Sequence, residues 1–143
     1  MPLAYSTSND ATAGCALWGI SNPFNGTSGD LLISGAITDG VFLGVQKVLS
    51  SGNGNWKLFC FSSSVSTIVD TGIPVVANQR YAAEFIIQSG IVTAFINGTL
   101  VATCSTHVPI VPLSLAFMGG TTATSTNSQY LTFEYLYVEN SMP

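Results

Sequence analysis

Short apolar runs, separated by clusters of glycine, asparagine, serine and proline, recur every eight to twelve residues from residue 14 onward. That spacing is typical of an all-β sandwich or barrel, in which each run forms a strand and each cluster a turn. No segment keeps the helical period of apolar residues long enough to predict a helix. The nearest candidate, residues 41–49, is rich in valine and follows Asp39-Gly40, so it is predicted to be a strand that leads into a loop.

The clearest strands lie in residues 81–103. Alternate residues at the start of this segment form one face that is expected to pack on the core: Tyr81, Ala83, Phe85 and Ile87. Ser89-Gly90 is a two-residue turn, and Asn97 with Gly98 supplies the two positive-φ positions of a type I′ hairpin. The segment therefore predicts a three-stranded antiparallel meander.

The two ends of the chain differ from this pattern. Residues 1–13 are small and polar without periodicity and are predicted to be an arm or a disordered leader, ahead of a single β-sandwich domain in residues 14–143. Residues 130–138 are apolar or aromatic on both faces, which predicts a strand covered by two layers of the fold or by another subunit. We predict that the two ends of the chain contact neighbouring subunits. This predicted assembly surface contains four tyrosines: Tyr5, Tyr130, Tyr135 and Tyr137.

Charged groups are scarce in this chain. Charged residues make up 7% of the sequence, whereas a typical soluble domain has about 25%. The polar surface must therefore come from uncharged groups, including 17 serines, 15 threonines and 9 asparagines. Three scattered lysines and arginines cannot neutralise a run of phosphates, so nucleic acid is not an expected partner. A surface of this kind can be buried against neighbours without desolvating ions, which suits permanent contacts.

The cysteines and the N-terminus bear on the compartment. Cys15, Cys60 and Cys104 are odd in number and widely spaced, so they are predicted to be packed thiols and not a disulfide framework, a metal site or a redox site. Residues 1–6 lack the basic region and apolar core of a secretory signal, so export is not expected. No apolar run is long enough for a membrane span, and a membrane is not an expected partner.

A series of segments in the later part of the chain carries a family resemblance. In chain order the series is Asn55-Trp56, residues 69–75, Arg80-Tyr81, residues 92–101, His107-Val108-Pro109 and residues 133–138. It resembles the laminin-G-like, concanavalin A-like jelly roll common among structural proteins of tailed bacteriophages. The resemblance implies an antiparallel jelly-roll sandwich. The first half of the chain aligns only loosely, which implies that one or two opening strands are missing or are supplied by a neighbour.

The resemblance also implies a function. The expected role is that of a capsid decoration, or cement, protein on the virion surface, made in the host cytoplasm without a signal peptide. Such a protein would form homo-oligomers, with a trimer favoured, and would bridge subunits of the major capsid protein. Because this fold also serves lectins, the alternative is a glycan-binding module of a tail fibre or baseplate. In that alternative Trp18 and Trp56 would stack on a sugar, although both indoles could equally anchor the core.

Catalysis and ion binding are not expected. Glycosidases of this fold use two closely spaced carboxylates, whereas Glu134 and Glu139 are five residues apart and fall on opposite faces of a strand. His107 is the single histidine, the chain has no G-x-S-x-G motif, and we expect a loop histidine capped by backbone groups. Asx turns are favoured over a calcium site at three aspartates: Asp30, Asp39 and Asp70. We therefore expect no enzyme activity, no cofactor and no metal.

Overall fold

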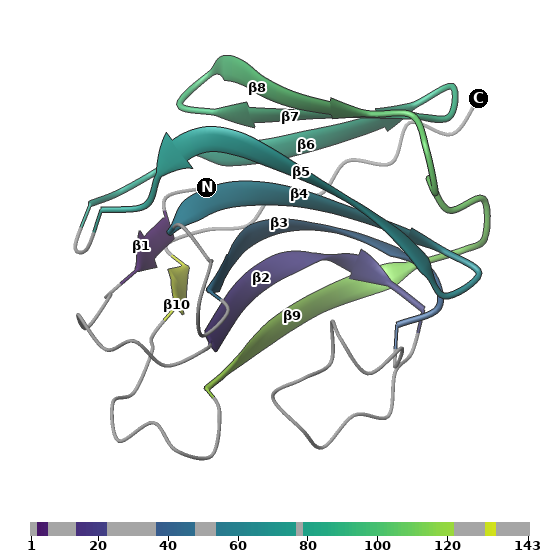
Figure 1. Cartoon of the computed structure of the whole chain (residues 1–143), viewed down its shortest axis with the longest axis horizontal. Coiled ribbons are helices and arrows are strands. Elements are labelled where there is room, and N and C mark those ends of the chain that lie inside the picture. Colours follow the sequence, from purple (N-terminus) through teal and green to yellow (C-terminus); the bar gives the residue numbers. More distant parts are fainter. Residues whose placement is uncertain are drawn as a thin grey trace.

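The structure is a computed structural model of the chain (Figure 1), and it describes residues 3–5, 14–22, 37–47, 54–76, 79–121 and 131–133. Every regular element in these residues is a β-strand, and every strand pair is antiparallel. The all-β prediction is therefore confirmed. In chain order the strands are β1 (Leu3–Tyr5), β2 (Gly14–Ser21), β3 (Gly40–Lys47), β4 (Asn55–Ser62), β5 (Val65–Pro74), β6 (Ala83–Gln88), β7 (Ile91–Ile96), β8 (Thr99–Cys104), β9 (Ser114–Thr121) and β10 (Leu131–Phe133).

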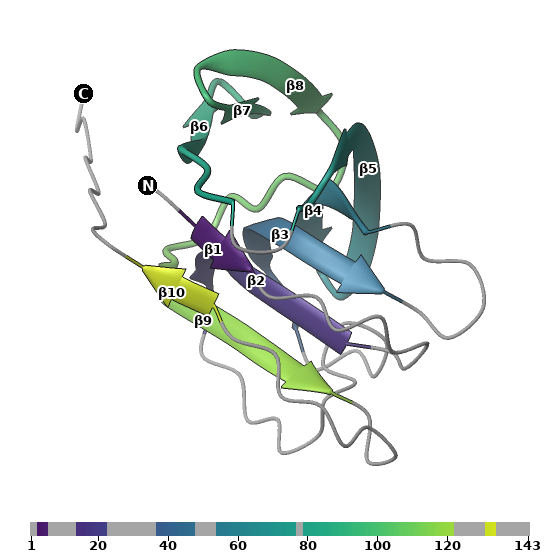
Figure 2. The same cartoon turned by 90° about the vertical axis from the view of Figure 1, so that its left-hand side faces the viewer.

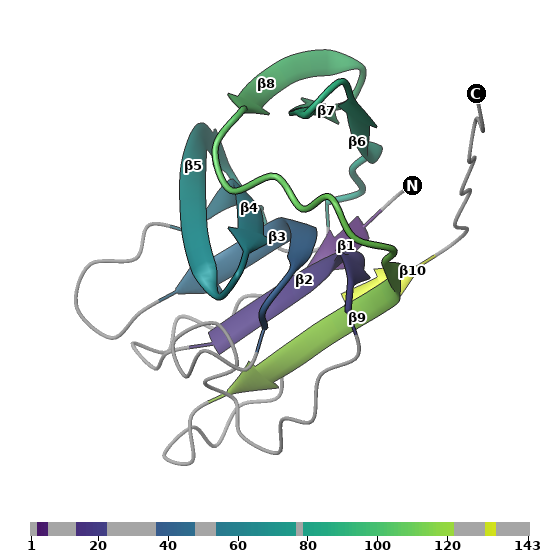
Figure 3. The ribbon, with the colours of Figure 1, turned by 90° about the vertical axis from the view of Figure 1, so that its right-hand side faces the viewer.

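The strands form a large sheet, a small sheet and a two-stranded pair. The large sheet has the order β5-β4-β3-β2-β9, the small sheet has the order β6-β7-β8, and β1 pairs with β10. The small sheet lies over one face of the large sheet (Figures 1 and 3), where β8 contacts β4 and β5, and β6 contacts β3. Residues 105–113 then carry the chain from β8 to β9 at the far edge of the large sheet (Figure 3). Two antiparallel sheets packed in this way are consistent with a β-sandwich.

The main core lies between the large and small sheets. Successive inward positions of β4 place Trp56, Leu58 and Cys60 in it, all fully buried. The small sheet contributes smaller side chains from the opposite side: Ala83, Val92, Ala94, Ile96, Ala102 and Cys104. Because large residues face small ones, the two layers can interdigitate at close range. Full burial of one large aliphatic or aromatic side chain contributes roughly 1.5–3 kcal/mol, so this layer is a principal source of stability.

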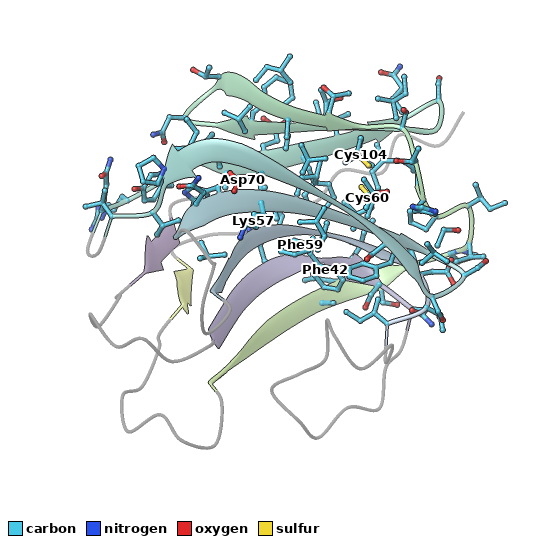
Figure 4. The ribbon with its side chains drawn as sticks, in the orientation of Figure 1. Phe42, Lys57, Phe59, Cys60, Asp70 and Cys104 are labelled. Carbon is cyan, nitrogen blue, oxygen red and sulfur yellow. The ribbon has the colours of Figure 1, made fainter. Side chains whose placement is uncertain are left out.

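The large sheet is also buried on its other face. Phe42 of β3 and Phe59 of β4 lie opposite one another in register, and both are fully buried on the side away from the small sheet (Figure 4). Phe61 is buried on the same side and meets Phe42 edge to face, with ring centroids 6.2 Å apart. The centre of β4 is therefore apolar on both faces, which is typical of a strand enclosed between two layers.

Residues 81–103 form the predicted meander. Strands β6, β7 and β8 pair in sequence, and both predicted turns have positive φ at their two central residues: 52° and 74° at Ser89 and Gly90, 51° and 77° at Asn97 and Gly98. The prediction of the core face is correct at the start of β6 and wrong at its end: Tyr81 and Ala83 are buried and Phe85 is half-buried, whereas Ile87 is exposed.

The predicted strand in residues 41–49 is also present, because β3 runs from Gly40 to Lys47. The pair of β1 and β10 differs from the prediction for residues 1–13, which contain no pattern that favours regular structure. Leu3 pairs with Phe133 and Tyr5 with Leu131, so β1 and β10 lie side by side (Figure 2). Three-residue strands carry too little periodicity to be predicted from sequence. The final strand predicted for residues 130–138 is present in 131–133, and the rest of that segment lies outside the described residues.

Candidate functional site

The most distinctive exposed surface is the outward face of the small sheet. We define the outer face as the outward positions of β6, β7 and β8: Glu84, Ile86, Gln88, Ile91, Thr93, Phe95, Leu100 and Thr103. Three aliphatic side chains on this face are strongly exposed, with exposed fractions of 43% at Ile86, 43% at Ile91 and 54% at Leu100. Glu84 is the single charged residue on the outer face. The face can therefore be covered without desolvating more than one ion.

Hydrogen bonds just before the start of β6 tie the small sheet to the preceding loop and to the Asn97-Gly98 turn. The Tyr81 hydroxyl accepts a hydrogen bond from the backbone N–H of Val76 (2.8 Å), which fixes the loop that enters the small sheet. At the Asn97-Gly98 turn, the Asn97 N–H donates to the Ala82 carbonyl (2.7 Å) and the Asn97 side-chain oxygen accepts from the Ala82 N–H (2.9 Å). Backbone groups that are satisfied in this way keep a short meander rigid.

The predicted assembly tyrosines come from segments that the structure brings together only in part. Tyr5 lies in β1, opposite Leu131 of β10. Tyr130, Tyr135 and Tyr137 lie outside the described residues. The pairing of β1 with β10 places residues 3–5 beside residues 131–133.

Both tryptophans belong to the core. Trp56 is 0% exposed, and its ring meets Tyr81 edge to face at a centroid distance of 5.3 Å. Trp18 is 7% exposed and lies 5.0 Å from the ring of Phe85. Sugar stacking needs an open ring face, and neither indole presents one in this structure. Of the two roles considered for these residues, the structure places both in the role of core anchors.

The aspartates in the described residues organise turns. Asp70 accepts a hydrogen bond from the N–H of Gly72 (2.8 Å), which is the predicted Asx turn, and another from the Asn55 amide (3.0 Å). Asp39 accepts from the N–H of Ser63 (3.2 Å) and so ties the β4–β5 turn to the start of β3. Asp30 lies outside the described residues. Within the described ranges, no group of three or more histidine, cysteine, aspartate or glutamate residues is placed to hold a metal ion.

His107 lies in the loop after β8, as predicted, with a positive φ of 53°. Its Nδ1 atom lies 2.7 Å from the Thr67 hydroxyl of β5, which also lies 3.0 Å from the hydroxyl of Thr106. The side chain is exposed, and its hydrogen-bond partner is a side-chain hydroxyl, neither an acid nor the backbone group that was expected. This arrangement joins the loop to β5 and does not form the acid–histidine–nucleophile array of a hydrolase.

Cys60 and Cys104 were predicted as unrelated packed thiols, but the structure brings them together. They enter the core from opposite sheets, and their side chains are in contact there. Burial, together with this contact, raises the pKa of the Cys60 thiol far above its ordinary value. No signal in the sequence links the two residues, because their proximity results from the stacking of the sheets.

Comparison of the chain with protein-family models and with curated proteins finds no match in either case. In the part of the chain that the structure describes, no helix has the length and apolar character needed to cross a membrane.

Proposed function

We propose that this chain is a non-enzymatic structural protein of a tailed-phage virion, a capsid decoration protein with a concanavalin A-like jelly-roll fold. In this proposal it forms a homo-oligomer, with a trimer favoured, and bridges subunits of the major capsid protein. The observation that carries the proposal is the outer face of the small sheet, where Ile86, Ile91 and Leu100 are exposed beside the single charge of Glu84.

The free energy of covering a protein surface depends on its apolar area and on the ions that it carries. Burial of apolar area contributes about 25 cal/mol per Å², whereas burial of an unpaired ion costs several kcal/mol. The outer face therefore favours association with another apolar surface. Three six-residue strands provide a small contact, and contacts well below about 1,000 Å² are individually weak. When many copies bind to one capsid lattice, their weak contacts sum to a firm attachment, and a decoration protein would attach in this way.

The described acidic groups support a role without catalysis. Asp39 and Asp70 accept hydrogen bonds from backbone N–H groups of turns, which is a structural role. Glu84 stands on the outer face, opposite Phe95 in register, and no second carboxylate lies on that face. Glycosidic cleavage by paired carboxylates needs two of them about 5–10 Å apart around the bond. The described part of the chain does not offer such a pair on the outer face.

The test is attachment to a capsid. Purified protein is mixed with capsids that lack it, prepared from the phage that carries its gene, and the mixture is sedimented. We expect the protein to sediment with the capsids and to saturate at a fixed number of copies per capsid. A protein that stays soluble and monomeric beside intact capsids would contradict the proposal.

A second measurement separates this role from glycan binding. The folded protein is screened on a glycan array, and we expect no specific binding because the two indoles are buried. Specific and saturable binding to one glycan, combined with failure to attach to capsids, would favour the fibre or baseplate alternative.

A further inference from the structure

Two cysteines meet between the sheets. Cys60 of β4 and Cys104 of β8 have exposed fractions of 0% and 3%, and both belong to the core cluster between the large and small sheets. Their side chains are in contact, and Figure 4 shows both sulfur atoms in the space between the two sheets. The Cys104 thiol also donates to the carbonyl oxygen of Thr106 (3.1 Å). Both residues are free thiols in this structure.

The local geometry is suited to a covalent link. Stacked sheets usually lie about 10 Å apart, whereas a disulfide needs Cα atoms separated by roughly 4.4–6.8 Å. Strands β4 and β8 come closer than ordinary stacking, since Cα atoms of the two strands lie within 8 Å of one another. The two side chains are in contact across the core, and a bond between the sulfur atoms requires them to move until the sulfurs lie about 2.0 Å apart.

We propose that Cys60 and Cys104 are a disulfide site that joins the two sheets of the sandwich covalently. The oxidant is a low-molecular-weight disulfide, such as oxidised glutathione. One cysteine thiolate attacks this disulfide and releases one glutathione thiolate, and the second cysteine then attacks the mixed disulfide and releases the other. The Cys60–Cys104 bond forms as two electrons and two protons pass to the two glutathione molecules. This inference does not depend on the proposed function.

The burial of the pair determines when the bond forms. Only a thiolate attacks a disulfide, and burial suppresses the thiolate form of Cys60 and also excludes the oxidant. The folded, reduced protein should therefore react slowly. Oxidation should be fast when the sandwich opens or while the chain folds, because both sulfur atoms are then accessible.

The bond should stabilise the fold. It would close a loop that contains β5, β6, β7 and β8, and a cross-link of this span lowers the conformational entropy of the unfolded chain. For a domain of this size, we expect the thermal midpoint to rise by roughly 10 °C.

The experiment uses Cys15→Ser, which leaves only the two core cysteines. This variant is unfolded and refolded with oxidised and reduced glutathione, and in parallel with a reductant alone. We expect the oxidised product to be a monomer lighter by the mass of two hydrogen atoms, to yield a peptide linking residues 60 and 104, and to have the higher thermal midpoint. Cys60→Ser and Cys104→Ser in the same background are the matched controls, and neither should show the loss of two hydrogens.

Other outcomes would overturn the proposal. These are two free thiols after refolding in the oxidant, glutathione adducts on both cysteines, a disulfide between two chains, or a linked monomer that unfolds at a lower temperature than the reduced one. Peptide mapping of the unchanged chain after the same oxidation repeats the test without Cys15→Ser. A link from Cys15 to either core cysteine in that sample would also count against the proposal.

Discussion

Gly40, at the start of β3, lies where two strands and an aromatic ring meet. A Cβ atom at this position would lie 2.9 Å from the ring of Phe42, 3.0 Å from the Ile20 carbonyl oxygen and 3.0 Å from the Cβ of Ser21. Such separations are shorter than ordinary van der Waals contact, and two of the three neighbours are buried. Because Gly40 has no side chain, the ring of Phe42 can pack directly against it.

Gly40→Ala is predicted to lower the free energy of unfolding by about 1–3 kcal/mol, because an added methyl group must displace a packed ring or the backbone. Denaturation by urea measures the change. Gly54→Ala is the matched control, since a Cβ there would meet no atom within 4 Å. Equal midpoints for the two variants would show that the contact at Gly40 relaxes without cost.

Tyr81 combines a packed ring with a hydrogen-bonded hydroxyl. The ring meets Trp56, and the hydroxyl accepts from the N–H of Val76 (2.8 Å). Tyr81→Phe keeps the ring and removes the acceptor, so we predict a loss of about 1–2 kcal/mol in the free energy of unfolding. The measurement is again urea denaturation. A stability equal to that of the unchanged chain would mean that water replaces the hydroxyl at no cost.

At the scale of elements, the connection between β4 and β5 is unusual. Ser63 and Ser64 have φ values of 53° and 64°, a conformation that costs an L residue with a side chain roughly 1–2 kcal/mol. Two hydrogen bonds support it: the Ser63 N–H donates to Asp39, and the Ser64 N–H donates to the Thr38 carbonyl (2.9 Å). The turn thus depends on tertiary contacts with the loop before β3, whereas Asn97-Gly98 has residues that favour the same turn locally.

Ser64→Gly is predicted to stabilise the protein by about 1 kcal/mol, because glycine adopts positive φ without steric strain. A rise in the thermal midpoint measures this effect. Ser66→Gly, two residues later in β5 and also exposed, should have the opposite effect, since glycine within a strand costs about 0.5–1 kcal/mol. If both substitutions destabilised the protein, strain at Ser64 would not be the controlling factor.

At the scale of the whole molecule, charge and exposure are distributed in a way that bears on assembly. The outer face of the small sheet is exposed and nearly uncharged, whereas Lys57 and Asp70 lie opposite one another on β4 and β5 of the large sheet. The small sheet that bears the outer face and the β1–β10 pair are two separate regions of the molecule (Figures 1 and 2).

Leu100→Asp tests whether the outer face carries the attachment. Because Leu100 is 54% exposed, the substitution should change stability little, within about 0.5 kcal/mol. It should weaken sedimentation with capsids at least tenfold, since a buried unpaired carboxylate opposes contact. Ser66→Asp adds the same charge at an exposed position of the large sheet and should leave attachment intact. Equal attachment of both variants would show that the docking surface is not the outer face.

The local sequence pattern was sufficient to predict several features of this chain. Alternating residues in 81–103, with Ser89-Gly90 and Asn97-Gly98 between them, predicted the meander and both of its turns correctly. These features depend on neighbours in sequence: strand alternation has a period of two, and positive φ is favoured by asparagine and glycine. The all-β class follows from the same local signals repeated along the chain.

Contacts between residues distant in sequence were decided only by the tertiary structure. The burial of Trp18 and Trp56, the double-sided burial of β4, the pairing of β1 with β10 and the meeting of Cys60 with Cys104 all depend on which sheet covers which face. The local sequence around a tryptophan or cysteine in a strand is the same whether that face of the strand is covered by another sheet or exposed to solvent. The amino-acid sequence by itself therefore determined strands and turns, and the stacking of the two sheets decided which side chains are core, which are exposed, and which two thiols meet.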